Sequence, residues 1–341
     1  MGSNIHRTLS GVVLTVATFA SSAPAAAEDF YAGKTITLLV SSDAGGAYDL
    51  YSRLLARHLP KYIPGAPTMI VQNDPGGGGL RGAQQIYALA PKDGTKIGSL
   101  RAITMLDATL KIRGAEVDPT RYEWLSNISG DADVCSFWHT AGVRSVEDLR
   151  SRETLVGASG AGSLGFNFPS AINYTLQTRM KIITGYKGVA DRILAMQQGE
   201  LQGACGIYAS QLTGAYPQLL SSGQLIPVSQ SALHPHPAFP NVPLSQSFAT
   251  TDAQKRILQT LFSVPELAYP YAAPPGTPRD RVEILRRAFD EALRDPAMIE
   301  QAQSAKLVIN PTSGAQVAKI VAEMSDLSPG LQAEIRAAIG N

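Results

Sequence analysis

The sequence lacks most of the patterns that mark metal-binding, nucleic-acid-binding and membrane-spanning proteins. Its two cysteines and five scattered histidines form no cluster with the spacing of metal ligands. Its formal net charge of +1 provides no basic surface for a nucleic acid or an anionic membrane. Its N-terminal apolar run, Leu9 to Ala20, is shorter than the roughly 20 residues that span a bilayer. We therefore expect no metal, no cofactor and no nucleic-acid partner.

The first 27 residues have the features of a cleaved signal peptide. Arg7 supplies a positive start, the apolar run follows, and three alanines, residues 25–27, precede Glu28. We expect export to a bacterial periplasm as a soluble protein. Removing residues 1–27 of 341 leaves 314, more than one hydrophobic core usually serves, so two lobes are expected.

The two cysteines, Cys135 and Cys205, are an even pair in a chain expected to be exported. An oxidising compartment favours a disulfide between them. Two buried free thiols are the alternative. Both cysteines lie in segments that we interpret as strands, which favours the disulfide.

A strand, a glycine loop and a helix follow one another from Thr35 to Leu59. The β-branched run TITLLV is followed by SSDAGGAYD and then by leucines at helical spacing. The first amides of such a helix lack carbonyl partners and lie at the positive end of its dipole. This junction is therefore a candidate anion site.

The same arrangement is repeated directly afterwards. Thr68 to Gln72 is predicted to be a strand, Asn73 to Gly79 (NDPGGGG) a loop, and Leu80 to Leu89 a helix. Lys96 to Leu100 is a third strand, and Arg101 stands directly beyond it as one of few fixed positive charges near the loops. The carboxyl ends of neighbouring parallel strands face one crevice, so we expect both loops to grip a carboxylate there.

The second half of the chain restates this α/β pattern. Its predicted elements are a strand at Thr154–Ala158, a small-residue loop at Ser159–Gly165, a helix at Phe166–Leu176, a strand at Lys181–Thr184, a helix at Ala190–Gln198 and strands at Gly203–Gly206 and Leu225–Gln230. Asp252 to Phe262 is a predicted helix, and Val264 to Ala273 is predicted to be extended. Thr277 is a natural N-cap for a helix that has Pro278 as its first residue and continues to Leu293. The crossings between lobes, near Ile128–Asp133 and Val264–Tyr271, would form the hinge.

Three motifs suggest catalysis or nucleotide binding, and each is incomplete. The G-x-G-x-x-G at Gly160–Gly165 lacks the acidic residue about 20 positions later that a dinucleotide site needs. Ser159 resembles a nucleophile elbow, but Ala161 replaces its last glycine, and only His234 and His236 follow as bases. The run Gly76–Gly79 is followed by Leu-Arg instead of the Lys-Ser/Thr of a phosphate-binding loop. We therefore expect no enzyme.

Taken together, the motifs resemble the substrate-binding receptors of tripartite tricarboxylate transporters, the Bug-type receptors. They are GG-x-x-D at Gly45–Asp49, N-x-P-G-x-G-G at Asn73–Gly79, the DG turn at Asp93–Gly94, GAGS at Gly160–Ser163, GYKG at Gly185–Gly188, QGELQG at Gln198–Gly203, and the segment Ala273–Pro296. The match covers nearly the whole mature chain in order.

The resemblance implies an α/β, type II periplasmic-binding-protein fold that closes over a ligand and presents it to a membrane permease. The implied lobe I is residues 28–131 plus 266–341, and lobe II is residues 132–265, joined by a two-segment hinge with the cleft between them. The implied receptor is a monomer. Its ligand-binding residues would be Ser42, Asp43, Ala44, Gly45, Gly46, Ala47, Tyr48, Asp49, Gly76, Gly77, Gly78, Gly79 and Arg101 in lobe I, and Ser159, Gly160, Gly162, Ser163, Tyr186, Cys205, Gly206 and Tyr208 in lobe II.

The identity of the ligand stays open at this stage. Dicarboxylates, citrate-like acids, aromatic acids and nicotinate-like acids all suit these loops. Asp43 would repel an anion unless it points outward, caps an amide or binds through a cation. Two other functions also remain: an exported hydrolase of small acid esters that uses Ser159, and a receptor that presents its ligand to a membrane sensor.

Overall fold

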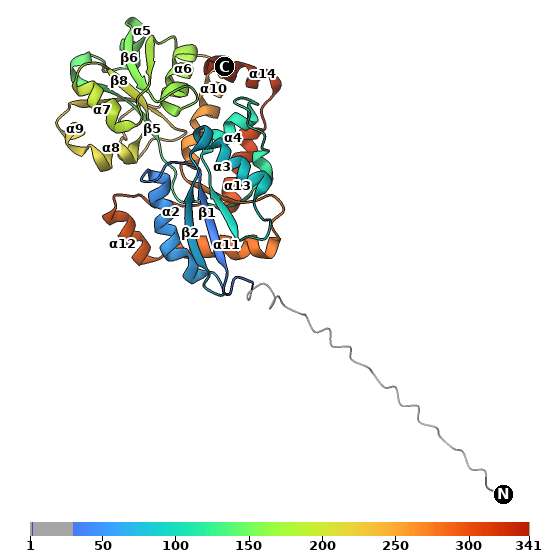
Figure 1. The fold of residues 1–341 in the computed structure, drawn as a ribbon. Coiled ribbons are helices and arrows are strands. Elements are labelled where there is room, and N and C mark those ends of the chain that lie inside the picture. Colours follow the sequence, from blue (N-terminus) through green and yellow to red (C-terminus); the bar gives the residue numbers. More distant parts are fainter. Residues whose placement is uncertain (1, 3–29, 341) are drawn as a thin grey trace.

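The fold comes from a computed structural model, which describes residue 2 and residues 30–340. The predicted signal peptide lies outside the described residues, apart from Gly2. The described chain forms two α/β halves, each built around its own sheet (Figure 1). No helix in this part of the chain is long and apolar enough to cross a membrane.

The first sheet has six strands in the order β11-β4-β10-β3-β1-β2. They are β1 (Thr35–Val40), β2 (Thr68–Asn73), β3 (Lys96–Ser99), β4 (Glu123–Asn127), β10 (Pro270–Ala273) and β11 (Thr312–Ser313). Strand β1 lies between β2 and β3 and is parallel to both, as the repeated strand-loop-helix pattern predicted. Four of its six residues are fully buried, because helices cover both faces of a parallel sheet.

Seven helices belong to the chain segments that form the first sheet. They are α2 (Ala47–His58), α3 (Leu80–Gln84), α4 (Ala102–Thr109), α11 (Arg279–Ala292), α12 (Pro296–Ser304), α13 (Gly314–Ser325) and α14 (Pro329–Ala338). The predicted helix Leu80–Leu89 is α3 followed by a single π-helical turn, Gln85–Leu89. The sequence analysis did not predict β4, β11, α4 or α14.

The second sheet has five strands in the order β7-β6-β8-β5-β9. They are β5 (Asp133–Trp138), β6 (Thr154–Ala158), β7 (Met180–Thr184), β8 (Gly203–Tyr208) and β9 (Leu225–Ser231). The helices of this half are α5 (Val146–Ser151), α6 (Leu164–Leu176), α7 (Val189–Gln197), α8 (Ala209–Ala215), α9 (Pro217–Ser221) and α10 (Asp252–Phe262). Strand β6 is parallel to β7 and β8, whereas β5 is antiparallel to β8 and β9.

The structure contains a disulfide between the two cysteines. Cys135 on β5 and Cys205 on the neighbouring strand β8 are bonded, with their Cα atoms 4.0 Å apart. Both residues are fully buried. The bond therefore joins the central strands of the second sheet.

Two connections run side by side between the sheets, at the predicted crossings. The amide of Ile128 donates to the carbonyl of Tyr269 at 3.1 Å, and the amide of Asp131 donates to the carbonyl of Pro265 at 2.9 Å. The side chain of Asn127 bonds both the amide of Tyr269 and the carbonyl of Glu266. The prediction that Val264–Ala273 is extended is partly wrong, because Val264–Leu267 forms a 3-10 turn before β10.

The C-terminal helices do not all pack in one place. Helix α12 packs against α2 and α13 packs against β4, both beside the first sheet, whereas α14 packs against α6 and α10 of the second half (Figure 1). The lobe boundaries expected from the sequence stay a prediction, and α14 is the segment whose packing departs from them. The predicted cap of α11 is wrong, because the Thr277 hydroxyl donates to the carbonyl of Pro274 and the helix begins at Arg279.

Candidate functional site

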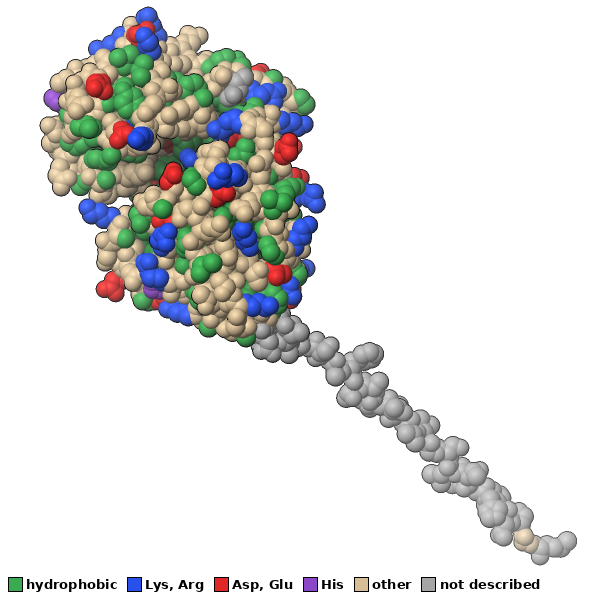
Figure 2. Space-filling view, in the orientation of Figure 1, with side chains coloured by type: hydrophobic (Ala, Val, Ile, Leu, Met, Phe, Trp, Pro, Cys, Tyr) green, Lys and Arg blue, Asp and Glu red, His purple; other side chains and the backbone are tan. Residues whose placement is uncertain are grey.

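A cavity of about 310 Å³ lies between the two halves of the molecule. Figure 2 shows a hollow at this level, with charged side chains of both signs spread over the face in view. The lining residues come from both halves: Ser42, Asp43, Gly46, Ala47, Tyr48, Arg101, Ala102 and Ile103 from the first; Ser159, Ser163, Leu164, Gly165, Lys187, Gly188, Val189, Arg192, Gly206, Tyr208 and Gln211 from the second; and Val264 and Tyr269 beside a connection.

Five helices begin at this cavity, among them α8, whose N-cap residue Tyr208 donates its amide to the side chain of Gln211 at 3.2 Å. The other four come two from each half. Their N-cap residues are Gly46 (α2), Arg101 (α4), Ser163 (α6) and Gly188 (α7), and all four line the cavity. In none of these four helices does the side chain of the N-cap residue accept a hydrogen bond from the first amides, and Gly46 and Gly188 have no side chain that could. The first two amides of such a helix lack carbonyl partners within it, so they are available to a ligand. The third amides of α4 and α6 donate to the carbonyls of Arg101 and Ser163.

Five helices that begin elsewhere are capped by the side chain of their N-cap residue, whereas α3, α9 and α11 are not. Helices α5, α10, α12, α13 and α14 have N-cap residues Ser145, Thr251, Asp295, Ser313 and Ser328, and each of these accepts a hydrogen bond from an amide of the first turn. In these five helices the protein itself satisfies an amide of the first turn. At the cavity, Ser163 is of a capping type, but its hydroxyl donates to the carbonyl of Gly160 instead.

Asp49 holds the first glycine loop in place through hydrogen bonds. One carboxylate oxygen accepts from the amide of Gly45 at 2.8 Å and from Arg53 at 2.9 Å, and the other accepts from Asn73 at 3.0 Å. Asn73, at the end of β2, also donates to the carbonyl of Ser42 at 3.1 Å. Burial opposes ionisation of Asp49, but the hydrogen bonds from Arg53, Gly45 and Asn73 outweigh it and lower its pKa. Asp49 is 2% exposed and lies outside the lining, so it positions the loop.

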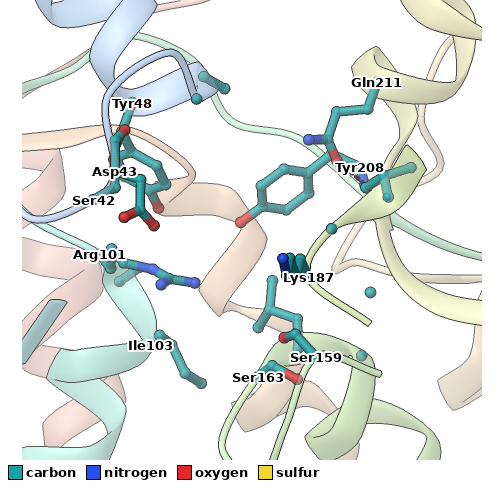
Figure 3. A pocket seen from close by; sticks show the side chains of 18 of the residues that line it. Ser42, Asp43, Tyr48, Arg101, Ile103, Ser159, Ser163, Lys187, Tyr208 and Gln211 are labelled. Carbon is teal, nitrogen blue, oxygen red and sulfur yellow. Dashed lines mark hydrogen bonds between the residues drawn. The ribbon is translucent and has the colours of Figure 1, made fainter. Parts of the chain in front are cut away.

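The second glycine loop, Gly76–Gly79, supports Arg101. Gly77, Gly78 and Gly79 have φ of 61°, 67° and 98°, which only glycine adopts readily. A Cβ at Gly79 would lie 2.7 Å from the Ser41 carbonyl oxygen and 2.8 Å from Cδ of Arg101. The loop thus packs on the stem of Arg101, and Figure 3 shows the guanidinium extending into the cavity.

Three tyrosines form an aromatic wall of the cavity. The rings of Tyr48 and Tyr269 meet edge to face with centroids 5.0 Å apart, and those of Tyr208 and Tyr269 are 6.2 Å apart. Burial raises the pKa of Tyr48 to about 12, although Arg101 opposes the shift through its charge and a hydrogen bond. Burial also raises the pKa of Tyr208 well above its usual value. Both hydroxyls are therefore neutral donors at physiological pH, and that of Tyr208 points into the cavity (Figure 3).

Arg192 fixes the opposite wall. It donates to the carbonyls of Cys205 at 2.6 Å, Gly206 at 3.1 Å and Gly188 at 3.3 Å. Burial lowers its pKa, and the charge of nearby Asp133 opposes that shift. Because its donors are used by backbone carbonyls, Arg192 ties the end of β8 to the start of α7. Lys187, the residue before the α7 cap, is exposed and faces the cavity (Figure 3).

The lining contains ten of the residues expected from the sequence: Ser42, Asp43, Gly46, Ala47, Tyr48, Arg101, Ser159, Ser163, Gly206 and Tyr208. The others lie outside it: Ala44, Gly45, Asp49, Gly76, Gly77, Gly78, Gly79, Gly160, Gly162, Tyr186 and Cys205. Among these, Gly162 lies against Arg113, whose guanidinium reaches it from the first half and pairs with Asp107. Sequence reasoning missed Lys187 and Gly188, although the GYKG motif contains both.

Ser159 also lines the cavity, but neither His234 nor His236 does. His236 instead lies beside β9, where its amide donates to the side chain of Gln230 at 2.8 Å. Among the described residues, no group of three His, Cys, Asp or Glu side chains could hold a metal ion. The charged side chains in the lining are Arg101, Lys187 and Arg192 together with Asp43, so the cavity offers hydrogen bonds and an excess of positive charge.

Comparison with known proteins gives relatives of one kind. No family model matches the sequence. The chain is 24% identical to a UPF0065 protein of Bordetella bronchiseptica over 84% of this chain and 81% of that protein. It is 26% identical to a UPF0065 protein of Cupriavidus necator, over 80% and 79%.

Solved structures share the fold. A TctC solute-binding protein from Polaromonas superposes with a TM-score of 0.69 and 18% identity, covering 91% of this chain and 99% of that one. The periplasmic binding protein BugD gives 0.67 and 19%, covering 90% and 98%. MatC from Rhodopseudomonas palustris, solved with malate, gives 0.65 and 18%, covering 90% and 99%. The predicted two-lobed α/β fold and the resemblance to TctC and Bug proteins are confirmed.

Proposed function

We propose that this chain, which has the two-lobed fold of the TctC solute-binding proteins, is a periplasmic receptor for a small organic carboxylate. It captures the acid in the cavity between its halves and delivers it to a membrane permease of the tripartite type. The malate in the MatC structure supports the carboxylate class. The periplasmic location agrees with the neighbouring binding proteins and with the predicted signal peptide.

The observation that carries this proposal is the group of four uncapped helix starts around one cavity. Each start offers amides at the positive end of a helix dipole, and a carboxylate is the smallest common organic group that accepts several such donors. Arg101 and Lys187 add positive charge from opposite halves. Charge-assisted hydrogen bonds contribute about 1.5–3 kcal/mol each, so two or three supply about 3–9 kcal/mol toward the roughly 8 kcal/mol of micromolar binding, and packing in the cavity adds to them.

The same arrangement gives a mechanism for closure. An anion held by donors of both halves has more contacts in the closed form than in the open form. A ligand shifts such an equilibrium by its difference in affinity for the two states. The paired connections, with Ile128 bonded to Tyr269, are where we expect the chain to bend. We expect the receptor to act as a monomer.

A thermal-shift screen against a panel of carboxylates tests the proposal. A ligand that binds only the folded state stabilises it by about 2.7 kcal/mol at 100 times its Kd, so a binding acid raises the melting temperature. The matched amide of each acid serves as the control, because it keeps the shape and loses the charge. A folded protein whose melting temperature no acid raises would contradict the proposal, as would equal shifts by acids and amides.

Delivery to a permease needs its own test. The closed, ligand-bound protein is immobilised and incubated with solubilised membranes from the source cells. We expect it to retain permease subunits, and the ligand-free protein to retain fewer. Retention of a membrane sensor instead would assign the receptor to signalling.

A further inference from the structure

A second cavity of about 390 Å³ adjoins the first. Its walls come from α2, the start of α7, helix α8 and the chain that follows α12. Four residues line both cavities: Ala47, Val189, Gln211 and Tyr269. Ala47 and Val189 have no polar side-chain atoms, so their part of the boundary between the cavities is apolar. Gln211 marks the boundary at the upper right of Figure 3.

The two cavities differ in charge. Arg101, Lys187, Arg192 and Asp43 line the first, whereas Lys306 is the one charged residue in the lining of the second. The ammonium group of Lys306 donates to the carbonyl of Gly214 at 3.2 Å, across the cleft. An anionic group in the second cavity would therefore meet the charge of one lysine, whereas three positively charged side chains line the first.

Other polar groups of this lining are also engaged with the protein. The hydroxyl of Tyr51 donates to the carbonyl of Val308 at 2.8 Å and accepts from its amide at 3.0 Å. The hydroxyl of Ser210 donates to Asp131 at 2.5 Å. What these groups leave for a ligand is largely apolar surface: the side chains of Ala47, Val189, Ala215, Ala305 and Leu307 and the rings of the tyrosines.

We propose that the ligand carries an apolar extension, alkyl or aromatic, which passes Ala47 and Val189 and occupies the second cavity. This inference rests on the proposed function, since it assumes that the carboxylate is held at the helix starts of the first cavity. Each cavity is of the size of known small-molecule sites. The ligand class is then a carboxylic acid with an apolar tail.

Calorimetry with unbranched monocarboxylic acids from acetate to octanoate tests the inference. Each methylene group that enters an apolar site strengthens binding by up to about fourfold. We expect the affinity to rise at least tenfold from butyrate to octanoate. Ala215→Leu and Ala305→Leu fill the second cavity from opposite walls, at exposed positions that should not disturb folding. Each should remove the gain of octanoate and leave butyrate unchanged.

Ala333→Leu is the matched control, because Ala333 is an exposed helical alanine on α14 outside both linings. It should alter neither acid. If short acids bind and affinity does not rise with chain length, the inference is wrong and the proposed function stands. If the rise persists in both cavity-filling variants, the tail lies elsewhere and the inference is again wrong. If no carboxylate binds the folded protein, the proposed function fails as well.

Discussion

Replacing Arg101 by methionine tests the electrostatic part of the site. The stem of Arg101 packs on Gly79, and its guanidinium faces the cavity from the start of α4. Methionine keeps an unbranched stem in that contact and removes the charge. A charge-assisted hydrogen bond contributes about 1.5–3 kcal/mol, so Kd for the carboxylate should increase by about 10- to 150-fold.

The assay is calorimetry with the acid that gives the largest shift in the thermal screen. The melting temperature of the ligand-free variant should match that of the wild type, because the aliphatic packing is kept. Arg279→Met is the matched control: its side chain is 92% exposed and pairs only with Glu283 on the same helix. It should leave affinity unchanged. Native affinity in a folded Arg101→Met protein would refute the charge argument, and so would an equal loss of affinity for the uncharged amide of the acid.

Three further predictions concern charge, the disulfide and pH. Asp43→Asn should tighten carboxylate binding by up to about fivefold in calorimetry, because it removes an exposed negative charge from the lining. The repulsion between that charge and the bound anion is about 1 kcal/mol or less. Unchanged affinity would mean that the carboxylate of Asp43 points away from the anion. Reducing Cys135–Cys205 should lower the midpoint of urea unfolding. The bond closes a sequence separation of 70 residues, and the chain-entropy relation gives a stabilisation of the folded state of about 4 kcal/mol. An unchanged midpoint after complete reduction would contradict this. Burial raises the pKa of Asp133 to about 8, although the amide of Gly206 and the charge of Arg192 oppose the shift. The folded state therefore holds a proton that the unfolded state, with a pKa of about 3.9, releases, and the free energy of unfolding should fall as pH rises from about 4 to 8. Asp133→Asn should lack this component, so its stability relative to the wild type should increase between pH 5 and pH 8.5 in urea titrations; a constant difference would contradict the shift.

The local elements were accessible from the sequence because their signals are local. The β-branched run of β1 and the Gly-Gly turn before α2 predict a strand, a loop and a helix from neighbouring residues alone. The parallel arrangement of β1 and β2 followed from the helix predicted between them, which returns the chain to the start of the next strand. The disulfide had one possible partner for each cysteine, so its pairing needed no geometry once export was inferred.

Choices between competing hydrogen-bond partners could not be made from the sequence. Thr277 has the residue type of an N-cap, yet its hydroxyl bonds Pro274 within the preceding turn. Asp49 lies in the glycine-loop motif, but the motif does not show that its carboxylate accepts hydrogen bonds from Arg53 and Asn73 and so supports the loop. Pro274 and Arg53 are close in sequence to their partners, whereas Asn73 reaches Asp49 from the next strand, so residue type alone did not decide these bonds.

The sequence by itself determined the class of fold, the two glycine loops and the expectation of an anion, since these depend on residue types and on spacings within a few tens of residues. Only the tertiary structure decided which helix starts meet at one cavity. Gly46 and Gly188 are far apart in the chain, and they line the same cavity because the two sheets face each other across paired connections. The adjoining cavity is likewise made by α2, α8 and the end of α12, whose shared surface exists only after the halves have packed.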